Sequence, residues 1–519
     1  MKLKPPECTY YYRKASFAFL CIFMLAYLNS SELTAQPTLQ AKNMGVAGIG
    51  TAYLSGFSSL YYNPANLMIR EYPLDNEIVI GQGAVRFEPV ISSEQASAQW
   101  KRNRWFFKPY EENGYPSDRD IDTYNRTKFL NENYRRNRTV AENDAYAEIV
   151  HLGYLHRNSD NAWAVGMRTR YANRFNIGRG WYSHDLVNGD STLNQSLRQD
   201  YQVLHEISFG WAQSFTYING LNPNLRRLFI GIAPKFVMGG DYLRYDAGRT
   251  YHPETNKLAQ KHQLYSAGAT TKSYNAYRRT GMAGEAAAKH LSFNAMNQPS
   301  GYGVGLDFGL AYVFTFSDDL SILGQSVTDQ GTYKSVRFGF SITDIGMIRY
   351  KGNTLQASSV QDTTTITPAE LSESQSIYMG SPGEFMALMN LQNSQNAALN
   401  AQITSGPFTT LLPTAFHAGA LFEYNRLSLM ADITMGLTKN AYYSGKGVYR
   451  LGMELKPLPF LPVRGGIRFH RRYPVQIGMG TGVELHNWSL NVAGMFTTKN
   501  NDVFYEGSGA AISTLKFHF

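Results

Sequence analysis

From about residue 76 to the C-terminus, apolar and polar positions alternate along the chain with a period of two. Successive side chains of a β-strand point to opposite faces, so this period predicts strands with one apolar face. The stretch 302–316 shows the pattern well, with small or polar residues between these large apolar ones: Tyr302, Val304, Leu306, Phe308, Leu310, Tyr312, Phe314 and Phe316. Segments of ~10 residues are long enough to cross a bilayer as tilted strands.

Fourteen such segments are predicted, and the connections between them alternate between long and short. The segments begin near residues 76, 144, 161, 201, 227, 302, 332, 411, 426, 446, 461, 474, 488 and 509. The long connections cover about 93–143, 177–200, 245–301 and 352–410, and the short ones include 158–160, 425, 457–460 and 486–487. Outer-membrane barrels join their strands by short periplasmic turns and longer external loops. The sequence therefore predicts an even-stranded barrel with both termini in the periplasm.

The even strand count requires residues 332–351 to form one bent strand. Asp344 and Gly346 interrupt the alternation in the middle of this stretch. Glycine and a break in alternation are typical of a kink or bulge. We therefore predict a strand kink at these two residues.

Composition supports a transmembrane barrel over a helical membrane protein. Aromatic residues make up 13% of the chain and charged residues 17%, with 46 glycines, and the mean hydropathy is −0.33. A negative mean is compatible with a barrel, because only alternate residues of each strand face lipid. Alternation alone would also fit a soluble sandwich, but strand length and aromatic strand ends favour the membrane. The expected fold is all-β, a transmembrane antiparallel up-and-down barrel spanning 76–519.

The first 35 residues are predicted to be a cleaved secretory signal peptide. Lys2, Lys4, Arg13 and Lys14 precede an apolar stretch over 15–28, and a polar segment ending in Ala35 follows. This is the layout of an export signal, with a retained anchor as the alternative. Cys8 and Cys21 both lie within it, so the exported chain carries no disulfide or cysteine chemistry. The expected location is the bacterial outer membrane.

Residues 36–75 separate the signal from the first strand, and they neither alternate nor have low complexity. Their small residues allow close backbone approach, and an Asn-Pro pair fixes a turn. The segment is therefore expected to pack compactly in a confined space. The residues that carry this prediction are Asn43, Gly45, Gly48, Gly50, Asn63, Pro64, Ala65 and Leu67.

With its Gly-rich start and its Asn63-Pro64-Ala65 triplet, this segment resembles the long-chain fatty-acid transporter (FadL-like) family of outer-membrane barrels. The resemblance implies that residues 36–75 form a hatch that plugs a fourteen-stranded lumen, and that hydrophobic substrates pass sideways near a kinked strand. The run Phe57–Leu60 and Asn66 depart from the family pattern. The motifs at 305–309 and 343–346 are similar to an uncharacterised branch of these barrels.

The last residues of the chain show a pattern typical of recognition during barrel assembly. Alternation continues through Ala511, Ser513, Leu515, Phe517 and Phe519, and the chain ends on an aromatic residue. This resembles the terminal signal by which barrels are recognised during assembly. Leu515, Phe517 and Phe519 are the residues predicted to carry it, with the barrel-assembly machinery as partner.

No pattern in the sequence indicates an enzyme, a cofactor or a metal site. The net charge of +9 comes from interspersed charges of both signs and does not indicate nucleic-acid binding. We expect a monomer, surrounded by outer-membrane lipids, that passively takes up a small hydrophobic ligand. The alternative is a non-transporting barrel that serves as a docking or scaffold component of a secretion or surface assembly. A water-filled porin is less favoured, because it needs no segment of this length before its first strand.

Overall fold

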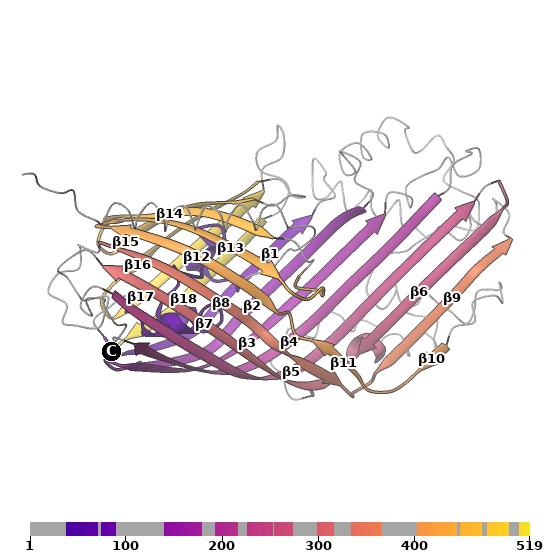
Figure 1. Cartoon of the computed structure of the whole chain (residues 1–519), viewed down its shortest axis with the longest axis horizontal. Coiled ribbons are helices and arrows are strands. Elements are labelled where there is room, and N and C mark those ends of the chain that lie inside the picture. The colour runs from indigo at the N-terminus through magenta and orange to yellow at the C-terminus, as the bar shows by residue number, and fades with distance from the viewer. Residues whose placement is uncertain are drawn as a thin grey trace, which may run out of the picture.

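The structure is a computed structural model in which fourteen strands close into an antiparallel barrel (Figure 1). The described residues are 38–70, 74–89, 140–178, 193–215, 226–252, 254–272, 298–315, 334–365, 402–443, 447–469, 475–497 and 508–519. The predicted signal peptide and the greater part of the first and fourth predicted loops lie outside these ranges. Among the described residues, no helix combines the length and apolarity needed to cross a membrane.

Each strand of the barrel pairs with its neighbours, and the last strand pairs with the first. In order around the barrel, the strands are β1 (Asn76–Pro89), β2 (Val140–Arg157), β3 (Asn161–Gly178), β4 (Leu193–Phe215), β5 (Arg226–His252), β7 (Gly301–Thr315), β8 (Lys334–Tyr350), β12 (Ala415–Tyr424), β13 (Leu427–Gly436), β14 (Val448–Leu458), β15 (Leu461–Phe469), β16 (Gln476–Glu484), β17 (Trp488–Thr497) and β18 (Ser508–His518). The predicted fourteen strands and their antiparallel order are confirmed.

Four further strands join the sheet, and three of them extend it beyond one end of the barrel (Figure 1). The far part of β5 pairs with β6 (Lys257–Ala267), which pairs with β9 (Leu355–Thr365), and β9 pairs with β10 (Gln402–Thr404). The short strand β11 (Phe408–Leu411) pairs with the end of β8. We call β6, β9, β10 and the paired end of β5 the external sheet.

The external sheet corrects the predicted loops at 245–301 and 352–410, which contain strands β6, β9, β10 and β11. Strand β4 likewise begins at Leu193, inside the predicted loop 177–200. Outside the membrane, a strand does not need an apolar face. The period-two alternation of hydropathy therefore disappears there, although the ladder of backbone hydrogen bonds continues. Hydropathy alternation therefore marks the part of each strand that crosses the membrane, and it misses the rest.

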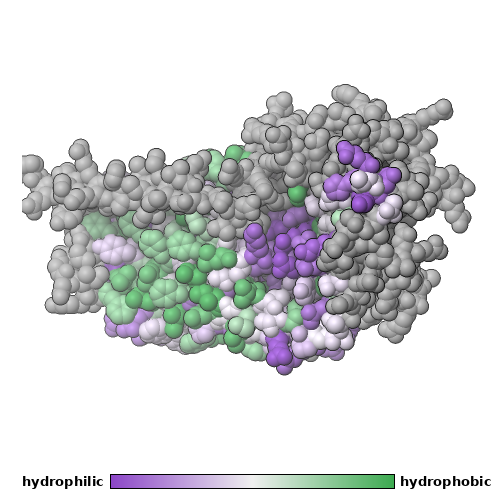
Figure 2. Space-filling view, turned by 45° about the vertical axis from the view of Figure 1, so that its right-hand side comes forward, coloured by the Kyte–Doolittle hydropathy of each residue, from purple (hydrophilic) through white to green (hydrophobic). Residues whose placement is uncertain are grey.

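The outer surface of the barrel carries an apolar belt, as expected of a wall that faces lipid. Figure 2 shows hydrophobic side chains gathered over one part of the surface, with hydrophilic ones beside them. In β7, Tyr302, Val304, Leu306 and Phe308 are exposed, while Asp307 is fully buried on the lumen side. The predicted division of this strand into a lipid face and a lumen face is confirmed.

The lumen is filled by the N-terminal segment 38–69, which we call the hatch (indigo in Figure 1). It contains three short helical elements: α2 (Ala41–Met44), η1 (Gly56–Ser59) and η2 (Pro64–Met68). Helix η2 packs against β4, β5 and β7, and α2 packs against β16, β17 and β18. The hatch thus contacts opposite sides of the barrel wall.

Candidate functional site

The hatch lies against glycines whose missing side chains leave room for its backbone and for its side chains. A Cβ built on Gly231 of β5 would lie 2.4 Å from the backbone nitrogen of Ala65, and one on Gly478 of β16 would lie 2.5 Å from that of Ala47. The lumen-facing glycines that meet the hatch in this way are Gly153, Gly166, Gly210, Gly231, Gly309, Gly339, Gly419, Gly452, Gly466, Gly478 and Gly480. We call them the glycine belt, and they come from strands all around the barrel. Together they form a recessed lumen surface, here called the seat, that is complementary in shape to the hatch.

Polar side chains fix the hatch in this seat. Asn63 donates from Nδ2 to the carbonyl oxygens of Thr51 at 2.9 Å and of Leu310 in the wall at 3.1 Å. Its Oδ1 accepts from the backbone N–H of Ala65, which caps η2, and Pro64 suits the first position of that helix. The Asn-Pro-Ala triplet therefore forms both a helix start and a bond to the barrel.

A single carboxylate of the wall holds the middle of the hatch. Asp432 Oδ2 accepts hydrogen bonds from the backbone N–H groups of Gly50 and Thr51 and from the Thr51 hydroxyl, at 3.2, 2.9 and 2.6 Å. Arg450 lies 3.2 Å from the other oxygen and balances its charge. Removing a buried partner from such a set leaves unpaired polar groups, which is costly.

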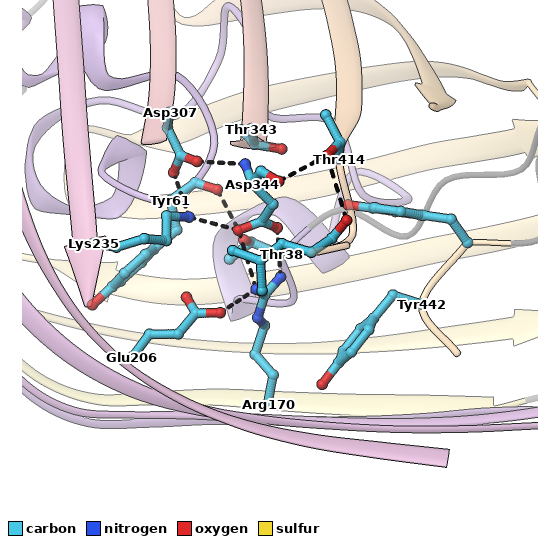
Figure 3. A network of polar contacts seen from close by, with 12 residues as sticks. Thr38, Tyr61, Arg170, Glu206, Lys235, Asp307, Thr343, Asp344, Thr414 and Tyr442 are labelled. Atoms are coloured by element: carbon cyan, nitrogen blue, oxygen red, sulfur yellow. Dashed lines mark hydrogen bonds and ion pairs between the residues drawn. The ribbon is translucent and has the colours of Figure 1, made fainter. Parts of the chain in front are cut away.

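A buried network of seven charged side chains occupies the lumen wall beside the hatch (Figure 3). Its members are Glu148, Arg168, Arg170, Glu206, Lys235, Asp307 and Asp344. Asp344 lies at its centre, 2.6 Å from Lys235 Nζ and 2.8 Å from Arg170 Nη1. Lys235 also lies 2.8 Å from Asp307, and Arg170 is paired with Glu206. Buried charges persist in a low-dielectric site only when paired in this way.

The same network binds the start of the hatch. Arg168 donates to the Thr38 hydroxyl at 2.9 Å and lies over the ring of Tyr61, 4.1 Å from its centroid. Glu148 accepts from the backbone N–H of Leu39 at 3.0 Å. The hatch is therefore held both by shape and by charge.

Asp344 also forms the kink of β8. Its φ is +59°, a conformation that Asp tolerates better than most residues, and the β7–β8 register shifts opposite Asp307. The Asp344 backbone N–H donates to Asp307 at 2.6 Å, which fixes the bulge. Strand β8 thus stays one strand and bends at a charge-stabilised residue.

The barrel wall is interrupted where β8 bends. Before the kink in sequence, β8 pairs with β12, and the last facing pair is Thr343 and Ala415. After the kink, β8 pairs with β11, and the first facing pair is Met347 and Leu411. Between these ladders only two bonds join the wall: Leu412 N–H to the Gly346 carbonyl at 3.0 Å, and the Thr414 hydroxyl to the Asp344 carbonyl at 2.8 Å. We call this junction, residues 343–347 and 411–415, the seam.

Apolar side chains meet the seam on both sides of the wall, next to the charge network around Asp344. On the outside, Leu411 is 60% exposed and Met347 is 54% exposed. On the inside, apolar and aromatic side chains pack together in one cluster, including Leu204, Val237, Ile348, Tyr350, Phe408, Leu412 and Ala415. Much of the remaining lumen wall carries buried charges, including Asp432, Arg450, Glu454, Arg464 and Arg468. An apolar surface therefore runs from the lipid face to the lumen only where such a cluster reaches the wall, and the seam is one such place.

The other predicted residues lie in the described part as follows. Asn43 lies in α2, and its Nδ2 donates to the Thr38 carbonyl at 2.6 Å. Gly48 lies in the turn after α2 with φ +92°, and its backbone N–H donates to the Asn43 carbonyl at 2.7 Å. Gly45 packs against Gly480, and a Cβ on Gly50 would meet the Tyr62 ring. Leu67 packs against Gly210. All of them lie in the hatch and are buried.

The predicted C-terminal row is split between the two faces of β18. Leu515, Phe517 and Phe519 face outward, whereas Ala511 and Ser513 face the lumen. A register shift between β17 and β18, at Ser489 and Asn491, moves the alternation by one residue. A bulge reverses every face beyond it, so one unbroken alternation in the sequence lies partly on the lumen face and partly on the outer face.

The charge network and the glycine belt were not predicted from the sequence. Arg168 and Arg170 stand at alternate positions of one strand, as lumen-facing residues must, and this spacing was the available signal. Nothing in the sequence pairs them with Asp344, which is more than 170 positions away. Among the described residues, no group of three or more His, Cys, Asp or Glu side chains could hold a metal ion.

Comparison with known proteins yields a family and a set of similar folds. The family model described as "Family of unknown function (DUF5723)" matches residues 83–493. No curated protein matches the sequence. Among solved structures, the Pseudomonas putida toluene transporter TodX is 11% identical over 94% of this chain and 99% of its own, with a TM-score of 0.44. A Pseudomonas aeruginosa FadL homologue is 10% identical over 94% and 100%, with a TM-score of 0.44. The Ralstonia pickettii toluene transporter TbuX is 10% identical over 93% and 99%, with a TM-score of 0.39.

Proposed function

We propose that this chain, which belongs to the family of unknown function DUF5723, is an outer-membrane channel for the passive uptake of small hydrophobic molecules. One observation carries the proposal: beside the Asp344 network, the seam has exposed apolar side chains on its lipid face and meets an apolar cluster on its lumen face. A hydrophobic molecule that crosses the wall there stays in contact with apolar surface, so it avoids the cost of entering water.

The hatch supports the same function. A porin needs an open aqueous lumen, whereas here the glycine belt and the Asp432 contacts hold a plug in place. Solutes that dissolve in water are therefore blocked along the barrel axis. Molecules that dissolve in lipid have a shorter route, which runs sideways through the seam.

Because few hydrogen bonds join the seam, it is the part of the wall whose opening costs the least free energy. Two hydrogen bonds join β8 to residues 412–414, and a typical hydrogen bond contributes only about 1 kcal/mol net. The intact ladders on either side would lose many bonds together. Long-chain fatty acids are one substrate class that the family resemblance suggests.

Uptake by reconstituted protein tests the proposal. Liposomes with lipopolysaccharide in the outer leaflet slow the unaided entry of hydrophobic dyes, so protein-mediated entry can be measured above the background. We expect faster entry of N-phenylnaphthylamine into protein-containing liposomes than into protein-free ones, with no increase in osmotic swelling in sucrose. Equal dye entry with and without protein would overturn the proposal, and sucrose-driven swelling would indicate a porin instead.

The external sheet favours a second candidate function, as a docking or scaffold component. It carries strands well beyond the barrel, where no lipid contact requires them (Figure 1). Isolation of the native protein in mild detergent separates the two candidates. A stoichiometric partner protein supports docking, whereas bound lipid or hydrocarbon supports transport.

A further inference from the structure

Residues 437–443, which follow β13 and which we call the loop, fold back into the barrel instead of extending outward. Ala441, Tyr442 and Tyr443 are all less than 5% exposed and pack in the same apolar cluster as Leu412 and Tyr350. Asn440 fixes the turn, since its Oδ1 accepts from the backbone N–H groups of Tyr442 and Tyr443 at 2.9 and 3.0 Å. The tip of this loop therefore lies inside the outer part of the lumen.

Tyr442 is held there by β3 and β4. Its hydroxyl donates to the Gln202 carbonyl at 3.2 Å, and the guanidinium of Arg170 lies over its ring, 5.1 Å from the centroid. Burial raises the pKa of the Tyr442 phenol well above its ordinary value, so the group stays neutral and remains a donor. A buried cation–π contact of this kind contributes to holding the loop in place.

The base of the loop is bonded to the seam. Thr438 donates from its hydroxyl to the Leu412 carbonyl at 3.0 Å and accepts from the Thr414 backbone N–H at 3.0 Å. The Leu437 N–H also donates to the Thr414 carbonyl at 2.8 Å. Three of the bonds that fix residues 412–414 therefore come from this loop.

The contacts form a closed ring around the seam. Asp344 pairs with Arg170, and Arg170 contacts Tyr442 at the loop tip. The loop base contacts Thr414 through Thr438. The Thr414 hydroxyl in turn donates to the Asp344 carbonyl, as Figure 3 shows. Displacing the loop tip therefore removes support from both sides of the seam.

We propose that Tyr442 is the residue that selects molecules by size, and that its loop must move before the seam admits a bulky one. This inference rests on the proposed uptake function and names the determinant of its specificity. Small hydrophobic molecules pass with the Tyr442 ring in place. Larger ones require the ring to leave the lumen.

Two hydrophobic dyes of different size test this inference in the liposomes described above. N-phenylnaphthylamine serves as the smaller and perylene as the larger, and the ratio of their entry rates is measured. We expect Tyr442→Ala to raise the relative entry of perylene at least threefold. For Tyr442→Phe, which keeps the ring, we expect the ratio of entry rates to stay within a factor of two of that of the parent protein. Tyr424→Ala, at an exposed tyrosine that ends β12 on the side away from the seam, serves as the matched control and leaves the ratio unchanged.

A second variant guards against misfolding as the cause of any change. Thr438→Val keeps the shape of the side chain and removes the two bonds to the seam, so it should also raise the relative entry of perylene. Heat-dependent mobility on denaturing gels confirms a folded barrel for each variant. If the parent protein admits dyes but Tyr442→Ala and Thr438→Val leave the ratio unchanged, size selection by this loop is wrong. If the parent protein admits neither dye, the proposed uptake function itself fails.

Discussion

Asn76 and Phe519 exchange two backbone hydrogen bonds, N–H to carbonyl in each direction, at 3.0 and 3.1 Å. Asn76 is the first residue of β1 and Phe519 is the last residue of the chain. The Asn76 side chain also donates to the Phe519 carbonyl at 3.1 Å. This pair ends the β1–β18 ladder, which closes the barrel by pairing its first strand with its last.

Deleting Phe519 should therefore impair closure. The truncated chain loses a reciprocal bond pair at the closing ladder and the exposed aromatic residue predicted to be read during assembly. We expect a several-fold lower yield of protein that migrates as a heat-modifiable barrel on denaturing gels. Phe460→Ala is the control, because Phe460 is an exposed aromatic residue at a strand connection and not at the closing ladder. Equal yields from the two variants would show that the terminal residue has no special role.

Gly231→Leu should displace the hatch. The new side chain would overlap the Pro64–Ala65 backbone, which lies 2.4 Å from the Cβ position. With the hatch displaced, liposomes containing this variant should swell in sucrose while those with the parent protein do not. Gly465→Leu is the matched control, since a Cβ at Gly465 meets nothing within 4 Å. If both variants stay impermeable to sucrose, the belt does not determine where the hatch sits.

Asp344→Asn should destabilise the folded barrel. Asparagine tolerates a positive φ, so the kink is retained, but Arg170 and Lys235 lose a buried carboxylate partner. Breaking one side of a buried ion pair costs about 3–5 kcal/mol of unfolding free energy. Unfolding in guanidinium, monitored by tryptophan fluorescence, measures this loss as a lower denaturation midpoint than that of the parent protein. Asp75→Asn, in a half-exposed pair with Arg70, should cost under about 1 kcal/mol.

Much of the fold could be predicted because the membrane imposes a simple rule on each strand. A lipid-facing residue must be apolar, so Val304 and Phe308 mark their strand without any knowledge of its neighbours. The rule does not apply beyond the bilayer, which is why β6 and β9 were taken for loops. It also fails across a bulge: Ala511 and Ser513 face the lumen, although Leu515 stands at the next alternate position and faces outward.

The candidate site could be predicted only where a local motif reveals it. Asn63-Pro64 is a helix start in any context, and an interrupted alternation at Asp344 indicates a bend. The contacts that give these residues a role are long-range, such as Asn63 with Leu310 and Asp344 with Arg170. The inward turn of Tyr442 depends on Gln202 and Arg170, which no local pattern links to it.

A disulfide across the seam tests most directly whether hydrophobic molecules cross the wall there. Met347 and Leu411 face each other in the β8–β11 ladder and both are exposed, so Met347→Cys with Leu411→Cys should form a bond that holds the seam closed. Leu429→Cys with Met453→Cys, a facing exposed pair of β13 and β14, is the matched control. We expect oxidation of the seam pair to abolish entry of N-phenylnaphthylamine and reduction to restore it, while the control pair has no effect. Full dye entry through the oxidised seam pair would contradict passage through the wall at this site.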